Sequence, residues 1–366
     1  MTRAEQAQPV SAPAMHPLDV AFAGEAAEVR SRWRRDAWIN IVLGGLYTPV
    51  ARRHVAQYLA SRTLVDGEAL DSVPVRKSLW PATFLVVLYL AARVAQEFGY
   101  GPPLPLVVIA GVLLLPYLWG LTVTRSVAGL RWRGIAFAFD VGWGRIYGES
   151  WPLLLLGCAW APWAPAVAEA ADDPSSLRLD APVLLLLAFA TVLALALLLR
   201  LGFQWKRLHI TGTRVGGSAV QWEGRFADYL RVWAGTVAAV ALSAVLPVVL
   251  LRYALLGSFT LQGLDPPVAA AVWLVGILLV WTLSVPARAW HEARMFVLAW
   301  SGLRVDSIAR VDCALDVRRY VRLRARNAWR TILTLGAHRP EATMQEHRAK
   351  VESLRILATA EVPRAA

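Results

Sequence analysis

The chain has little cysteine, little charge and none of the common catalytic signatures. Only two cysteines occur in 366 residues; Cys158 lies in an apolar run and Cys313 in a basic loop, so no disulfide is expected. No glycine-rich phosphate loop precedes Lys-Ser or Lys-Thr, and there is no Gly-x-Ser-x-Gly elbow. His291-Glu292 begins like a metalloprotease helix, but Met295 replaces the second zinc ligand. We therefore expect no catalytic residue, metal, cofactor or enzymatic activity.

We expect no signal peptide, because residues 1–36 contain no apolar core of the required length. Residues 1–19 are a low-complexity mixture of Ala, Pro, Gln and Ser, which predicts a disordered tail.

Charged residues make up only 17% of the chain, whereas 57% is hydrophobic and gathered in long blocks. This composition indicates a polytopic membrane protein. The 17 tryptophans agree, since indole rings favour the membrane–water boundary. The net charge of +12 comes from loops on one predicted side, so attraction to anionic lipid headgroups explains it better than nucleic-acid binding.

An eight-residue unit occurs four times in the connections between apolar runs. Each copy has Gly or Ser at its fifth position and Ala at its seventh; the copies are residues 63–70, 130–137, 213–220 and 303–310. Small residues in mid-unit, with Val or Trp shortly before them, predict a strand, a tight turn and a second strand. We expect these segments to pair into a small cytoplasmic sheet.

A second internal similarity joins the two ends of the chain at a spacing of 291 residues. It superposes Arg35 on Arg326, Ala37 on Ala328, Trp38 on Trp329, Ile41 on Ile332, Gly45 on Gly336, Pro49 on Pro340 and Ala51 on Ala342. Internal repeats are sought before a fold is argued, because they indicate how the chain is organised. We interpret them as two short terminal helices on either side of a repeated middle.

Six longer apolar runs lie near residues 80–97, 103–124, 151–169, 181–203, 230–253 and 267–287. The loops between them carry thirteen Lys or Arg residues on one predicted side and one, Arg178, on the other. Because basic short loops stay in the cytoplasm, the pattern predicts six spans entering as three hairpins, with both termini cytoplasmic. The expected fold class is thus an all-α polytopic protein with short strand-turn repeats on its cytoplasmic face.

Two further segments are predicted to lie at the membrane surface. The apolar run 37–50 is too short to cross a bilayer and is interpreted as an interfacial or half-inserted helix. Residues 317–335 form an amphipathic pattern with arginines at every fourth position, typical of a helix at the headgroup boundary or packed on the repeat units. From these features we divide the chain into residues 1–19, 20–78, 79–290, 291–342 and a polar tail, 343–366.

The stretch Gly45–Gly67 resembles the YjgN-like family of bacterial inner-membrane proteins (domain of unknown function 898). The family pattern is an apolar run, Gly-Ile-Tyr-Ser-Pro-Trp-Ala, basic residues with Arg-Tyr, and Thr-Arg-x-x-Gly. The matching residues here are Gly45, Tyr47, Pro49, Arg53, Tyr58, Thr63 and Gly67. Val50 departs from the expected Trp, and His54 to Gln57 replace much of a basic cluster. The resemblance covers most of residues 20–342 and implies the inner membrane, but no biochemical activity.

We interpret most of these motif residues as architectural, with Gly67 in a turn and Pro49 ending the short helix. Arg53 is expected to hold a lipid phosphate or a partner's carboxylate. The first functional hypothesis is a transporter or channel-like permease, because the repeated hairpins have kinked, sparsely polar spans. The alternative is a membrane scaffold or assembly factor that recruits a membrane-protein partner, or a second copy, through its basic cytoplasmic face.

Overall fold

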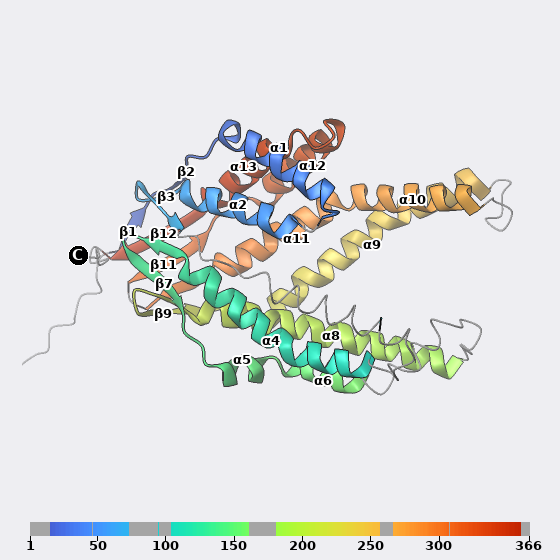
Figure 1. The fold of residues 1–366 in the computed structure, drawn as a ribbon, viewed down its shortest axis with the longest axis horizontal. Coiled ribbons are helices and arrows are strands. Elements are labelled where there is room, and N and C mark those ends of the chain that lie inside the picture. The colour runs from blue at the N-terminus through green and yellow to red at the C-terminus, as the bar shows by residue number, and fades with distance from the viewer. Residues whose placement is uncertain are drawn as a thin grey trace, which may run out of the picture. The chain divides into compact units, whose positions relative to one another are not determined.

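The computed structural model describes residues 15–45, 47–72, 94, 104–160, 181–256, 266–306 and 308–359. The chain divides into two compact units (Figure 1). Unit 1 contains residues 1–70, 133–135 and 239–366, so it unites the two ends of the chain. Unit 2 contains residues 71–132 and 136–238.

The strands of unit 1 form two antiparallel groups. The first runs in the order β1, β12, β11, β10, and the second in the order β2, β3, β4. Their bounds are β1 Met15–Leu18, β2 Val20–Phe22, β3 Thr63–Val65, β4 Glu68–Ala69, β10 Leu303–Val305, β11 Ala309–Cys313 and β12 Leu354–Thr359. The first strand of the described chain therefore pairs with the last.

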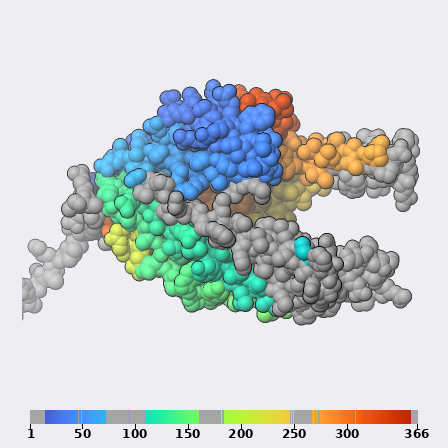
Figure 2. All heavy atoms as spheres, viewed as in Figure 1, coloured from blue at the N-terminus to red at the C-terminus, as the bar shows by residue number. Residues whose placement is uncertain are grey.

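The helices of unit 1 are α1 Ala26–Val42, α2 Thr48–Ser61, α10 Pro266–Leu283, α11 Val285–Trp300, α12 Val317–Leu333 and α13 Arg339–Val351. Helix α1 packs on α2 and α13, and α12 packs on α11 and α13. The buried core beneath them contains Val20, Phe22 and Val29 from the N-terminal segment with Met344 and Val351 from α13. Figure 2 shows the same association, with blue N-terminal atoms lying against red C-terminal ones.

Unit 2 combines long helices with five antiparallel strands in the order β9, β8, β7, β6, β5. Its elements are β5 Asp71–Ser72, α4 Leu104–Ala128, β6 Leu130–Trp132, β7 Ile135–Phe139, α5 Trp143–Glu149, α6 Trp151–Trp160, α8 Ala181–Thr211, β8 Thr213–Val215, β9 Ser218–Trp222 and the first part of α9 Phe226–Leu256. Val123, Val127, Phe139, Ile146 and Leu208 form its buried core. Helices α4, α5 and α8 thus pack on strand β7 through this core.

Each eight-residue unit forms the expected strand, turn and strand. The four hairpins are β3–β4, β6–β7, β8–β9 and β10–β11. Their turns contain residues with positive φ, including Asp66 and Gly67 at +54° and +75° and Arg133 and Gly134 at +51° and +77°. This conformation favours residues without a β-carbon, which explains the small residue in mid-unit. Ser307 of the fourth copy lies outside the described residues.

The prediction of an all-α protein with six spans is wrong. The structure contains antiparallel sheets as well as helices. Within the described segments two helices are long and apolar enough to cross a membrane, Ile109–Ala128 and Leu184–Thr211. A third candidate exists if Leu274–Leu283 and Val285–Trp300, bent by 42°, are counted as one span. These helices indicate membrane association.

Helix α8 shows that an apolar run need not face lipid along its whole length. A helix of 31 residues such as α8 is about 46 Å long, which exceeds the roughly 30 Å of a bilayer's hydrocarbon core. Part of its apolar run therefore packs on protein, as buried Leu201, Phe203 and Leu208 show. The predicted span 80–97, apart from Val94, and the second half of 151–169 lie outside the described residues.

The chain ends also differ from expectation. The run 37–50 is not one interfacial helix, because α1 stops at Val42 and α2 starts at Thr48. Pro49 lies in the first turn of α2 and does not end a helix. Residues 15–18 form a strand inside the expected disordered tail, and α13 and β12 occupy most of the expected polar tail.

Candidate functional site

The α1–α2 hairpin has facing polar rows because both helices carry polar residues at every fourth position. On α1 these are Glu28, Arg32, Asp36 and Asn40; on α2 they are His54, Tyr58 and Arg62. A spacing of four places side chains on one helix face. Because α1 packs on α2, the two rows meet along the hairpin.

The hairpin turn is built by the first motif residues. Gly45 has φ +93°, and its N–H donates to the Asn40 carbonyl at 2.8 Å. Its own carbonyl accepts from the Thr48 hydroxyl at 2.7 Å. A glycine in this left-handed conformation ends α1 without the strain that a β-carbon would add. Thr48 also donates to the Asn40 side chain at 2.9 Å, which fixes the start of α2 against the end of α1.

Further along the hairpin, Asp36 is 3% exposed and pairs with His54, with Oδ2 and Nδ1 2.8 Å apart. A buried carboxylate needs such a partner because burial without a hydrogen bond is costly. This contact holds the middle of the two helices in register.

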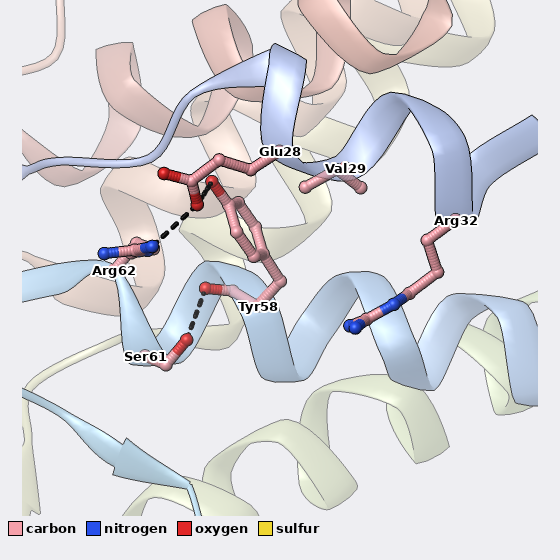
Figure 3. Close-up of a pocket in the computed structure, with 6 residues that line it drawn as sticks. All are labelled: Glu28, Val29, Arg32, Tyr58, Ser61 and Arg62. Atoms are coloured by element: carbon pink, nitrogen blue, oxygen red, sulfur yellow. Dashed lines mark hydrogen bonds and ion pairs between the residues drawn. The ribbon is translucent and has the colours of Figure 1, made fainter.

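At the open end of the hairpin the rows separate around a pocket of about 430 Å³ (Figure 3). Its lining residues are Glu28, Val29, Arg32, Tyr58, Ser61 and Arg62. Arg62 donates to Glu28 at 2.7 Å, while the Arg32 guanidinium lies across the gap at the other end of the pocket. The charged lining thus consists of two guanidinium groups and one carboxylate.

Tyr58 fixes the floor of this pocket. Its hydroxyl oxygen accepts from the Glu25 N–H at 2.9 Å, and its proton is placed between the Glu25 carbonyl at 3.0 Å and Glu28 Oε2 at 2.9 Å. Burial, assisted by the charge of Glu28, raises the pKa of Tyr58 above its ordinary value. The phenol therefore stays protonated at neutral pH and serves as a hydrogen-bonding group.

A second polar cluster lies between α11, α12 and α13. Arg324 forms ion pairs with Glu346 and, at 3.3 Å, with Glu292; Lys350 pairs with Glu292 on the opposite side. Fully buried Asn327 lies 3.5 Å from Glu346 Oε1. With opposite charges so closely interleaved, we interpret the cluster as a structural joint between the three helices.

The structure brings only some of the predicted motif residues together. Gly45, Tyr47 and Pro49 form the α1–α2 turn. Tyr58 lines the pocket, and Thr63 follows it at the start of β3, buried and 3.2 Å from His347 Nε2. Arg53 is half-buried on α2 and not part of the pocket lining, and Gly67 lies in the β3–β4 turn.

Sequence reasoning missed Glu28, Arg32, Arg62 and the Asp36–His54 pair. The spacing of four along residues 28–40 and 54–62 was the available signal, but the apolar run 37–50 was treated as one helix and obscured it. Nothing in the sequence pattern indicated that His54 pairs specifically with Asp36 or that His347 packs edge-on against Phe22.

Among the described residues, no three His, Cys, Asp or Glu side chains gather as a metal-binding group. The family model described as "Bacterial protein of unknown function (DUF898)" matches residues 17–365, which confirms the resemblance inferred from Gly45–Gly67. No curated protein and no solved structure matches the chain.

Proposed function

Since the chain belongs to this uncharacterised bacterial family, we propose a function from its geometry: a membrane-anchored scaffold that recruits a partner protein through the α1–α2 pocket. The observation that carries the proposal is that the family motif builds a helical hairpin with a polar, solvent-open pocket. Tyr58, the motif residue in the pocket, positions Glu28 beside Arg62.

The pocket chemistry favours an acidic segment as the ligand. Arg32 and Arg62 outweigh the single carboxylate of Glu28, and exposed Arg34 on α1 adds a further positive charge. A guanidinium group binds a carboxylate through two parallel hydrogen bonds, which gives direction as well as affinity. An aspartate, a glutamate or a C-terminal carboxylate of a membrane-protein partner therefore fits.

We place the scaffold in the bacterial inner membrane as a multi-pass protein, with anionic lipid around it and both termini in the cytoplasm. The basic loops support this orientation, and the apolar helices α4 and α8 support the anchoring. The pocket would then face the cytoplasm.

The test is chemical cross-linking in native membranes followed by purification in mild detergent. Arg32→Gln should abolish recovery of a stoichiometric partner, whereas Arg52→Gln, an exposed arginine of α2 outside the pocket, should leave it unchanged. Two outcomes would contradict recruitment through this pocket: a partner that is lost equally with both variants, or no stoichiometric partner recovered with the wild-type chain.

Transport is the second candidate, favoured by Pro116 inside α4 and Pro247 inside α9. A proline within a helix leaves the carbonyl four residues earlier without its usual donor, and such a group can bind a solute. Flux measured in reconstituted vesicles over a panel of neutral and amphipathic solutes tests it. Solute flux that survives Arg32→Gln but is lost with Pro116→Ala would favour the permease over the scaffold.

A further inference from the structure

The α1–α2 and α12–α13 hairpins have the same turn geometry although they lie 291 residues apart. Gly45 and Gly336 both have φ +93°. The Gly45 N–H donates to Asn40 at 2.8 Å, and the Gly336 N–H donates to Thr331 at 2.7 Å. A proline lies in the first turn of both following helices. Unit 1 therefore contains two copies of one helical hairpin.

Both hairpins end in exposed apolar side chains. The first tip consists of Trp38, Ile41, Val42 and Leu43, and the second of Trp329, Ile332, Leu333 and Leu335. Val42 is 79% exposed and Leu335 is 98% exposed. One exposed leucine needs no explanation, but four apolar residues gathered on each of two matching turns indicate a binding surface.

The exposed charges next to both tips are basic, and the two adjoining carboxylates, Asp36 and Glu341, pair with His54 and Arg30 respectively. Arg34 and Arg35 precede the first tip, Arg326 and Arg330 precede or flank the second, and all four are exposed. No Asp or Glu occurs in residues 37–50 or 317–340. Apolar side chains with Trp, bordered by Arg, suit the boundary of an anionic bilayer.

The side of unit 1 that faces the bilayer is inferred from α10, which belongs to the same unit. Its apolar side chains are exposed along its length; Leu274, Ile277 and Trp281 are examples. In Figure 1 the turns after α1 and α12 both lie at the side of unit 1 from which α10 extends. An apolar helix leaving toward the bilayer brings both tips to the surface of that bilayer.

We propose that the two hairpin tips insert end-on into the headgroup boundary of an anionic bilayer and hold unit 1 against it at two points. End-on insertion follows because the inward face of each helix is buried in protein, whereas the exposed apolar side chains gather at the tips. Tyr320 and Asn327 of α12 are 1% and 0% exposed, and the helix packs on α11 and α13. The helix thus cannot lay its full length on the membrane. The inference rests on the proposed membrane location of the protein. It does not depend on recruitment of a partner through the α1–α2 pocket.

The test uses the full chain in lipid nanodiscs, with no partner present. Cys158→Ser and Cys313→Ser remove the native thiols, and Val42→Cys or Leu335→Cys then carries an environment-sensitive fluorophore. Glu352→Cys is the matched control, because Glu352 is exposed just after the opposite end of α13. Lipids with a nitroxide near the headgroup quench fluorophores in the membrane, and iodide quenches those in water.

In nanodiscs containing phosphatidylglycerol, labels at positions 42 and 335 should be quenched by nitroxide lipid several times more strongly than the label at 352. Replacing the lipid with phosphatidylcholine, or combining Arg34→Gln, Arg35→Gln, Arg326→Gln and Arg330→Gln, should weaken that quenching. Iodide access at 42 and 335 equal to that at 352 would overturn the proposal. Labels sheltered from both quenchers would also overturn it, since a protein would then cover the tips. Equal quenching in both lipids would overturn the anionic preference.

Discussion

At the residue scale, His347 connects the two ends of the chain. Its ring packs edge-on against Phe22 with centroids 4.9 Å apart, and Nε2 lies 3.2 Å from the Thr63 hydroxyl. Burial, together with the nearby positive charge of Lys350, lowers the pKa of His347 to about 4. Arg348, which lies over the Phe22 ring, adds a further positive charge to this region. The imidazole is therefore neutral in the folded protein at physiological pH.

This depressed pKa predicts a loss of stability in acid. Between pH 6.5 and about 4 the unfolded chain binds a proton at His347 that the folded chain does not, so the free energy of unfolding falls as the pH is lowered through this window. His347→Gln should flatten that part of the profile. Thermal unfolding in detergent at a series of pH values measures it, with His16→Gln on exposed β1 as the control; an unchanged slope in His347→Gln would contradict the assignment.

At the element scale, the two terminal hairpins of unit 1 share one turn geometry. Each has a glycine with φ +93° two residues after the C-cap of its first helix, and a Cβ added at Gly45 or Gly336 would meet nothing within 4 Å. The requirement is thus one of backbone conformation and not of space. The similarity at a spacing of 291 residues was visible in the sequence, but the helix–turn–helix was not, because the turn lies inside an apolar run.

Gly45→Ala and Gly336→Ala should each destabilise unit 1 by about 1–2 kcal/mol, the cost of a β-carbon in the left-handed conformation. The two values should agree within experimental error because both glycines have φ +93°. Gly144→Ala is the control: Gly144 lies in α5 with a conventional φ and open space around it, so alanine should be neutral or stabilising. Chemical denaturation followed by circular dichroism distinguishes the two cases.

The cluster between α11, α12 and α13 predicts unequal effects of two glutamates on one helix. Glu346→Ala removes a carboxylate that pairs with Arg324 and whose side chain is 8% exposed. The free energy of unfolding should fall by about 2–3 kcal/mol. Glu341→Ala removes a pair with Arg30, which is 53% exposed, and should cost about 0–1 kcal/mol. Equal losses in denaturant midpoint would show that Arg324 and Glu346 do not form a buried joint.

At the scale of the whole molecule, local patterns were predictable and long-range pairing was not. The four hairpins followed from small residues at fixed positions, and membrane association followed from long apolar runs. The association of β1 with β12 joins Met15 to Thr359, and no local pattern in either strand specifies a partner at that distance. An apolar residue such as Leu201, which is 6% exposed, looks the same in sequence whether lipid or protein covers it, so the length of an apolar run does not say how much of it crosses a membrane.

The central proposal is that the β8–β9 hairpin lies on the cytoplasmic side of a membrane that α8 crosses. Fusions of green fluorescent protein and alkaline phosphatase after Gly217, in the β8–β9 turn, test it most directly, with fusions after Ser175, before the candidate span Leu184–Thr211, for comparison. We predict fluorescence without phosphatase activity at Gly217, and phosphatase activity at Ser175. Phosphatase activity at Gly217 would contradict the account.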